Sequence, residues 1–565
     1  MALPWGKSKS DGPKTVHIAL GFFYIINFVV GTGFLGIPYS FYYSGYVAAI
    51  PTLLVIMVAT GINANYLLEC MARAQAVEAH KESIKASINS ENPQDKENYV
   101  QNDDIKHPKF EITIHRKFEQ VEMCEIFYSK WVKYLYLIVL TIYSFLALWS
   151  SCTVAGSAWA INLPFNFSTI QKCNESDFQR TLLPPEPCLN SYFVSLSIFG
   201  VIVILLSLLD LKEQAIVQVV LGLLRFVTVG AIVIYSIVKI SESGNKCLLE
   251  GLPNFNETPY PAYVTNATHS PLIEKFNFLG WISAIPVLTY AFIFHGGLPS
   301  MTHPIKQKKY LHWLLLAIFA ATGVCYFSIG IFLPLWFRVE IQETCTLNWG
   351  ELTQPPASLP LRILSYYIIL FPSLDVVSAY PLGVHVIVNN VYVIITGQDT
   401  SEKPNHRFSK YDLLLRLALR FFSALLPVLI ASGVANLIYV LNYAGLFGFA
   451  ICFGFPTALQ LRSIYVCKKR FAHTLKKHDK SQVAAIKGLH SVQETTPLIP
   501  AQEVRGSDQS LYMTPYSNRL FSHPIAAWMV GAMGFVLFCL TFASLFTSVF
   551  YPQRVESCYS GLDEF

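Results

Sequence analysis

The sequence predicts an all-α integral membrane protein with eleven transmembrane helices, and three observations lead to this fold class. Of its 565 residues, 53% are hydrophobic and only 14% are charged, whereas soluble globular proteins carry about 25% charged residues. Eleven apolar runs are long enough to approach or exceed the roughly 20 residues that a helix needs to cross a bilayer. The first of these runs is interrupted by glycines at its centre. The small net charge of +5 gives no indication of nucleic-acid binding.

The predicted spans divide the chain into membrane and loop regions. They lie at 16–45, 46–72, 132–161, 192–209, 215–240, 277–299, 311–337, 360–391, 413–433, 435–460 and 525–551. The predicted organisation is a cytosolic N-terminus (1–15), spans one and two (16–72), a cytosolic loop (73–131), spans three to ten (132–460), a second cytosolic loop (461–524), span eleven (525–551) and an exoplasmic tail (552–565).

Two independent patterns orient these spans. Four glycosylation sequons fall in the loops after spans three and five, at Asn166, Asn174, Asn256 and Asn266. Such sites are glycosylated in secreted or lumenal regions, which makes both loops exoplasmic and the protein a predicted glycoprotein. Clusters of lysine and arginine follow spans six and ten, on the side that the positive-inside rule assigns to the cytosol.

The two long cytosolic loops differ from the rest of the chain. Residues 74–109 are polar and charge-mixed, which predicts disorder, and 110–131 then become amphipathic, as in a helix lying against a membrane or bundle. Residues 463–523 are basic and then rich in Ser, Thr and Pro, and disorder is expected there too. Within them, Glu494, Leu498 and Ile499 form an acidic-dileucine pattern of the kind that sorting adaptors read, which predicts a lysosomal or late endosomal membrane rather than the plasma membrane.

Four cysteines are candidates for disulfide bonds on the exoplasmic side. Cys173 with Cys188 would close a small loop between spans three and four, and Cys247 with Cys345 would tie two exoplasmic loops together. Neither pairing follows from the sequence alone. No group of residues shows metal-binding spacing, and no cofactor motif is present.

The interruption of span one is the main indication of function. Gly31-Thr32-Gly33 stands at its centre, with Gly36 and Pro38 close behind. Glycine loosens a helix and proline removes a backbone donor, and irregular backbone at membrane depth is tolerated only beside protein or a watery cavity. This pattern favours a polar ligand bound at a discontinuous helix. The alternative is a flexible kink in a helix that only packs.

Three runs of sequence resemble the amino acid/auxin permease family, within the amino acid–polyamine–cation superfamily. The runs are GTGFLGIP at 31–38, YAFIFH followed by GGLP at 290–299, and AGLFG with a later proline and LQLR at 444–462. The amino-acid sequence of spans one to three, and of the stretch EITIHRKFEQVEMCEIFY, is most similar to an orphan branch of this family. The resemblance implies the LeuT-like fold: a 5+5 inverted repeat with helices one and six broken, and a peripheral helix eleven.

A second interruption is expected in span six at Phe294–Gly297, which corresponds to Gly31–Gly36 in span one. The resemblance and the two interruptions together imply a substrate site at the midplane. A substrate carboxylate would meet N–H groups where the second half of span one begins, and a substrate ammonium would meet carbonyls where the first half of span six ends. The expected residues are Gly31, Thr32, Gly33 and Phe34 in span one and Tyr290, Ala291, Phe292 and His295 in span six. The alternative is that these residues only pack.

The residues expected to couple transport to an ion are Asn27, Asp375 and Ser378. In sodium-dependent relatives of the family, an Asn of helix one and hydroxyl residues of helix eight contribute to a sodium site. This chain has Asp375 where the family has a threonine, and ionisable residues at membrane depth commonly carry ions or protons. Asp375 is therefore a candidate proton carrier, a candidate Na⁺ ligand or one half of a structural hydrogen bond. Arg225 could pair with an acid or replace a cation with its own charge.

These residues favour a secondary active transporter for amino acids or similar small zwitterions, driven by protons. A sodium-coupled symporter is one alternative, and a transceptor that binds an amino acid and signals through its cytosolic loops is another. The expected partners are a small-molecule amino acid, H⁺ or Na⁺, the lipid membrane and a sorting adaptor, with no nucleic acid. No catalytic residue or nucleotide loop is found, so an enzyme is not expected.

Overall fold

The structure is a computed structural model, and its helices account for most of the chain that it describes. The described residues are 17–89, 110, 117–162, 173, 175–178, 182–186, 188–208, 214–242, 276–353, 355, 357–397, 412–471, 512–518 and 520–550. Within them, ten helices are long and apolar enough to cross a membrane, or eleven when a bent helix pair is counted as one span. The prediction of a multi-pass helical membrane protein is thus confirmed.

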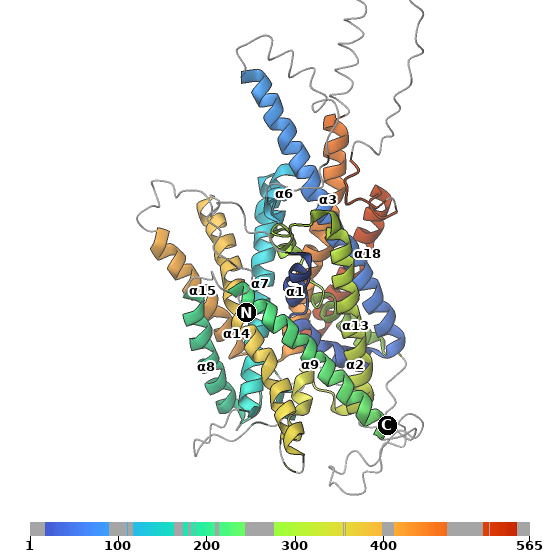
Figure 1. The fold of residues 1–565 in the computed structure, drawn as a ribbon. Helices are drawn as coiled ribbons and strands as arrows, with labels where there is room; N and C mark the ends of the chain where they lie inside the picture. Colours follow the sequence, from blue (N-terminus) through green and yellow to red (C-terminus); the bar gives the residue numbers. More distant parts are fainter. Residues whose placement is uncertain are drawn as a thin grey trace, which may run out of the picture.

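The spans follow the predicted order along the chain (Figure 1). Span one comprises α1 (Ile18–Val29), η1 (Thr32–Gly36) and α2 (Ile37–Ser44), and span six comprises α11 (Phe278–Tyr290), η4 (His295–Gly297) and α12 (Leu298–Thr302). The other spans are α3 (Tyr46–Asn89), α7 (Lys130–Asn162), α8 (Cys188–Leu208), α9 (Gln214–Glu242), α13 (Leu311–Phe337), α14 (Leu359–Thr396), α15 (Asp412–Ala431), span ten (Leu437–Phe471) and α18 (Pro524–Phe550). Span ten begins with α16 (Leu437–Phe449), followed by the π-helical turn η9 (Ala450–Gly454).

Helix α3 extends well beyond the predicted end of span two at residue 72. It continues as one helix to Asn89, because residues 73–89 are rich in Ala, Glu and Lys, which favour helix. Its first added turns are also buried: Val77 is 1% exposed, and the ring of His80 packs edge-on against Phe471. The prediction of disorder over 74–109 is therefore wrong for 74–89, and residues 90–109 lie outside the described part of the chain. The amphipathic stretch contains the short helix α6 (Gln120–Phe127), at the same end of the bundle as the C-terminal part of α3 (Figure 1).

The second cytosolic loop is also more ordered at its two ends than predicted. Span ten continues to Phe471 rather than stopping at residue 460. At the other end, residues 512–518 and 520–523 pack against the bundle, with the rings of Tyr512 and Tyr516 buried in its apolar core. The prediction of disorder over 463–523 is therefore wrong at both ends, because aromatic side chains there have a surface on which to pack.

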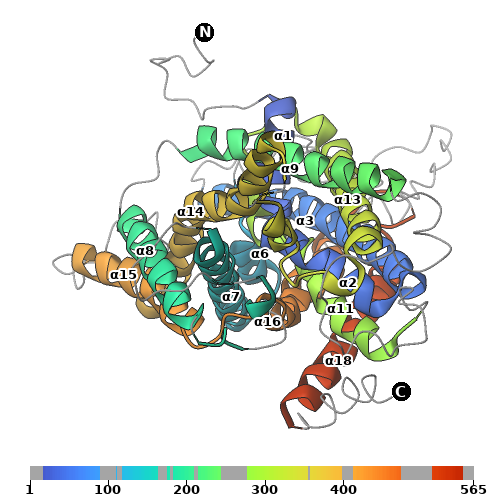
Figure 2. The ribbon, with the colours of Figure 1, turned by 90° about the horizontal axis from the view of Figure 1, so that it is seen from below.

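Some spans face the core and others face lipid. Helix α7 packs along α14, α8 and α16 inside the bundle, and the apolar window of span six is 78% buried. The corresponding windows of α15 and α18 are only 22% and 11% buried, as expected for lipid-facing helices. Figure 2 shows α8 and α15 side by side at one edge of the bundle and α18 at another edge.

Candidate functional site

The interrupted parts of spans one and six contact each other inside the bundle. Span one bends by 52° between α1 and the Thr32–Ser44 pair of helices. The α-helix of span six stops at Tyr290, and a turn over residues 291–294 precedes η4. A Cβ atom at Gly33 would lie 2.7 Å from the Ala291 Cα. The two main chains therefore meet where only a glycine fits.

Three hydroxyl groups from three different spans meet beside this contact. The Thr32 Oγ1 lies 3.0 Å from the Ser150 Oγ and 3.2 Å from the Tyr290 Oη, and the Ser150 and Tyr290 oxygens are 3.3 Å apart. All three side chains are buried. The cluster joins η1, α7 and α11 and provides uncharged donors and acceptors in an otherwise apolar core.

A tyrosine of span seven links the ends of the two interrupted helices. The Tyr326 hydroxyl donates to the Ala291 carbonyl at 2.8 Å and is 3.3 Å from the Val29 carbonyl. A carbonyl oxygen has two lone pairs, so Ala291 keeps capacity for a second donor. Tyr326 therefore fixes the position of one of the carbonyls that the sequence analysis assigned to a substrate ammonium.

The remaining expected substrate residues are divided between this contact and its surroundings. Gly31 and Phe34 flank the interruption of span one, and Phe34 is buried. The ring of Phe292 packs against Tyr326 with ring centroids 5.1 Å apart. His295 lies against α3, with its Nε2 3.0 Å from the Thr60 carbonyl oxygen and 3.8 Å from the Cys452 Sγ. His295 therefore contacts α3 and span ten rather than the hydroxyl cluster.

Two of the three predicted ion-coupling residues, Asn27 and Asp375, are brought together by an arginine. The Arg225 guanidinium of α9 forms an ion pair with Asp375 of α14, and its Nη1 donates to the Asn27 main-chain carbonyl at 2.6 Å. Arg225 and Asp375 are 4% and 6% exposed. The guanidinium thus lies between span one and span eight, where the sequence analysis expected an ion.

Two polar atoms of this ion pair are unmatched among the described residues. The Asp375 Oδ1 and the Arg225 Nε are buried without a hydrogen-bond partner there. A small cavity adjoins Arg225 and is lined by Asn27, Gly222 and Arg225 among others. Ser378 lies one turn further along α14, and its hydroxyl donates to the Asp375 main-chain carbonyl at 3.0 Å. Ser378 therefore contacts the backbone of Asp375 rather than the ion pair.

Sequence reasoning missed Ser150 and Tyr326 as parts of the site. Ser150 is one of several small polar residues in span three, and Tyr326 is one of 30 tyrosines. Neither stands in a motif or an interrupted helix, so no local signal separates them from packing residues. Arg225 was singled out because a charge inside an apolar run is costly, but its partner could not be assigned.

Several predicted residues lie away from the site or outside the described residues. The structure joins Cys173 and Cys188 by a disulfide bond, and Cys345 is buried as a free thiol. Among the described residues, the group Cys173, Asp177 and Cys188 has metal-like spacing, but the disulfide bond occupies both sulfur atoms. The predicted residues outside the described part of the chain are Cys247, the glycosylation sites Asn166, Asn174, Asn256 and Asn266, and the sorting residues Glu494, Leu498 and Ile499.

The fold is that of a multi-pass helical membrane protein, and comparison with known proteins assigns its family. A family model described as "Transmembrane amino acid transporter protein" matches residues 15–492. The chain therefore belongs to the transmembrane amino acid transporter family, which is a family of transporters and not of enzymes.

Within the family, the chain is similar to proteins named transmembrane protein 104. They form the branch that the sequence of spans one to three resembles. It is 25% identical to the transmembrane protein 104 homolog of Caenorhabditis briggsae over 389 residues, covering 67% of this chain and 69% of that protein. It is 23% identical to transmembrane protein 104 of Mus musculus over 404 residues, or 66% of this chain and 73% of that protein. It is 20% identical to transmembrane protein 104 of Homo sapiens over 404 residues, again 66% of this chain and 73% of that protein.

Proposed function

We propose that the protein is a secondary active transporter that moves amino acids or similar small zwitterions by alternating access, with protons as the driving ion. The observation that carries the proposal is the contact between the two interrupted helices at Gly33 and Ala291. Paired interruptions of this kind mark substrate sites in transporters built from repeats. The expected inverted repeat of spans one to five and six to ten is part of the proposal.

The polar groups at this contact suit a zwitterion. The N–H groups of Thr32, Gly33 and Phe34 stand at the start of η1, where a helix N-terminus favours an anionic carboxylate. The carbonyls of Tyr290 and Ala291 stand at the end of α11, where the helix dipole favours an ammonium. The hydroxyl cluster of Thr32, Ser150 and Tyr290 can exchange its internal hydrogen bonds for bonds to the substrate.

Protons fit the ion site better than sodium does. The Arg225 guanidinium already supplies a fixed positive charge beside Asp375 and the Asn27 carbonyl. A sodium ion bound there would lie next to a like charge, and at a few ångströms in a low-dielectric interior this repulsion is large. A proton added to Asp375 would instead weaken its bond to Arg225 and free the guanidinium to move. Coupling would follow from that change of partner between α9 and α14.

The proposed location is a lysosomal or late endosomal membrane. Its support is the acidic-dileucine pattern at Glu494, Leu498 and Ile499 in a predicted cytosolic loop. A proton-driven carrier also suits a compartment with an acidic lumen. The predicted adaptor and the glycans on the two exoplasmic loops belong to the same proposal.

The test is flux in vesicles that contain the purified protein. Each of the twenty common amino acids, radiolabelled, is added while a pH gradient and a Na⁺ gradient are imposed in separate experiments. The proposal predicts that at least one amino acid accumulates with the pH gradient alone. Accumulation that requires Na⁺ at constant pH would indicate the sodium-coupled alternative. Binding of an amino acid without flux, together with ligand-dependent capture of a cytosolic partner, would indicate a transceptor.

A further inference from the structure

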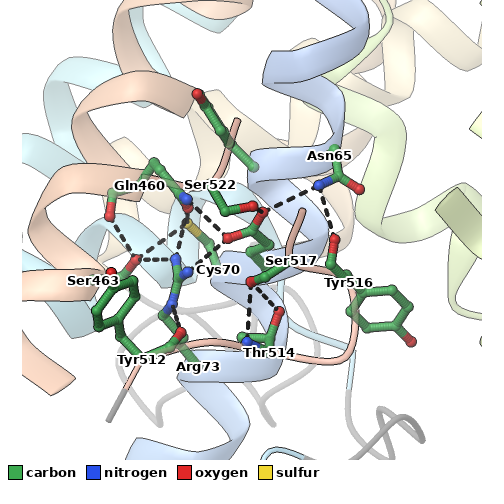
Figure 3. A network of polar contacts seen from close by, with 12 residues as sticks. Asn65, Cys70, Arg73, Gln460, Ser463, Tyr512, Thr514, Tyr516, Ser517 and Ser522 are labelled. Carbon is green, nitrogen blue, oxygen red and sulfur yellow. Dashed lines mark hydrogen bonds and ion pairs between the residues drawn. The ribbon is translucent and has the colours of Figure 1, made fainter. Parts of the chain in front are cut away.

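A network of buried polar side chains holds the segment before α18 against helix α3. Asn65, Glu69 and Arg73 are spaced four residues apart, so they lie on one face of α3. Glu69 and Arg73 form an ion pair with an N–O distance of 2.6 Å and no exposed side-chain surface. Figure 3 shows these contacts between α3, span ten and residues 512–518 and 520–522, here called the clamp segment.

Arg73 uses its guanidinium to join all three elements. Its Nη2 pairs with Glu69, and its Nη1 donates to the Gln460 Oε1 at 2.6 Å and to the Ser463 Oγ at 3.0 Å on span ten. Its Nε donates to the main-chain carbonyl of Tyr512 at 2.9 Å. One buried cation therefore binds its own helix, span ten and the clamp segment at once.

Glu69 makes the complementary set of contacts. It accepts from the Gln460 Nε2 at 2.8 Å, from the Ser522 hydroxyl at 2.5 Å and from the Asn65 Nδ2 at 3.1 Å. A buried carboxylate is costly unless its oxygens are paired and hydrogen-bonded. Ser522 of the clamp segment supplies one of these bonds, so the segment completes the ion pair rather than merely covering it.

Helix α3 also binds the main chain of the clamp segment. The Asn65 Nδ2 donates to the Tyr516 carbonyl at 3.1 Å, and the Tyr66 hydroxyl donates to the Phe521 carbonyl at 2.8 Å. With the bond from Arg73 to Tyr512, three carbonyls of the segment accept from α3. The Lys468 Nζ of span ten lies 4.8 Å above the ring of Tyr512, as a cation–π contact.

We propose that this face of α3, with Gln460 and Ser463 of span ten, is a docking site for a short peptide segment that contains turns, and that its occupant is the chain's own clamp segment. While docked, the segment locks the predicted cytosolic ends of α3 and span ten together, because parting them would break the hydrogen bonds that Gln460 and Ser463 make to the Glu69–Arg73 ion pair. The consequence for transport rests on the proposed function: the segment must loosen before this end of the bundle opens.

A native cysteine reports directly on the docked state. Cys70 is 0% exposed, and its Sγ lies 3.5 Å from the Ser463 Oγ and 3.8 Å from the Gln460 Oε1, inside the network. A thiol reagent can reach it only when the network opens. The experiment exposes membrane vesicles containing the full-length protein to N-ethylmaleimide and measures the labelling rate of Cys70 by peptide mass spectrometry. Cys152, buried in α7, is the internal standard in every sample.

The releasing variant removes two hydroxyl groups that hold the segment, by Tyr66→Phe with Ser522→Ala. The matched control is Tyr46→Phe with Ser328→Ala. Tyr46 also lies in α3 and donates to a distant carbonyl, that of Ile331, at 2.9 Å, while the Ser328 hydroxyl donates to the Val324 carbonyl of its own helix. Loss of two hydrogen bonds should raise the labelling rate of Cys70 roughly tenfold in the releasing variant. The control should label at the wild-type rate.

Equal labelling of Cys70 in the wild type, the releasing variant and the control would overturn the proposal. If the double variant does not reach the membrane, the single change Tyr66→Phe is measured instead, with an expected increase of roughly threefold. Because labelling needs no substrate, its outcome is independent of transport. Amino acid flux is measured in the same vesicles, and its absence from the wild type would contradict the proposed function without deciding the docking site.

Discussion

Replacing Gly33 with alanine tests whether the contact between the interrupted helices is the transport site. The added Cβ would lie 2.7 Å from the Ala291 Cα, 2.9 Å from the Tyr290 Cδ1 and 3.0 Å from the Ala291 N. Carbon atoms prefer separations of about 3.5–4.0 Å, so η1 and the end of α11 must part by roughly 1 Å. Overpacking of this kind costs about 1–3 kcal/mol, and a 1 Å displacement of binding groups can cost on the order of 100-fold in activity.

The assay is the initial rate of amino acid uptake by vesicles at low substrate concentration. Gly33→Ala should lower it by roughly 100-fold on the displacement argument, and Gly33→Val should abolish it. The matched control is Gly230→Ala in α9, where no atom lies within 4 Å of the new Cβ. Its uptake should stay close to wild type. Normal uptake by a correctly folded Gly33→Ala protein would refute the assignment of the site, as would equal losses in the two variants.

Three further predictions test the ion, the location and the topology. Asp375→Asn keeps the size of the side chain but cannot titrate, so accumulation driven by a pH gradient should be lost while exchange at equal substrate concentrations persists; full accumulation by the variant would remove Asp375 from the coupling mechanism. Leu498→Ala with Ile499→Ala should move the protein from lysosomes to the plasma membrane, as seen by surface biotinylation, and an unchanged lysosomal signal would show that another element directs sorting. Changing all four sequon asparagines to Gln (Asn166, Asn174, Asn256 and Asn266) should remove every glycosidase-sensitive shift on a gel. A surviving shift would contradict the predicted exoplasmic loops.

The parts of the fold that depend on local composition could be predicted from the sequence. Apolar runs locate the spans because a bilayer demands long stretches without charge. The interruption near Gly31 and Gly33 could be located because glycine and proline mark weak points in a helix. The second interruption was predicted at Phe294–Gly297, and the structure has the helix stop slightly earlier, at Tyr290. Such offsets are expected, since the end of a helix depends on its packing partners.

The parts that depend on distant contacts could not be predicted. Arg225 and Asp375 were each recognised as unusual, yet they are 150 residues apart, and nothing local shows that they meet. The clamp segment belongs to a polar, proline-containing stretch that resembles disordered chain. It is ordered because α3 carries Asn65, Glu69 and Arg73 on one face. Glu69 accepts a hydrogen bond from the Ser522 hydroxyl, 453 residues away, and nothing in the local sequence indicates this contact.

Proton movement that depends on an amino acid tests the central claim most directly. Vesicles with the wild-type protein are loaded with a pH-sensitive dye, without Na⁺ on either side, and receive an amino acid identified in the flux screen. A proton-coupled transporter should acidify the vesicle interior as the amino acid enters, and Gly33→Ala vesicles should show almost no change. Amino acid accumulation without any change of internal pH, or accumulation only after Na⁺ is added, would contradict the account.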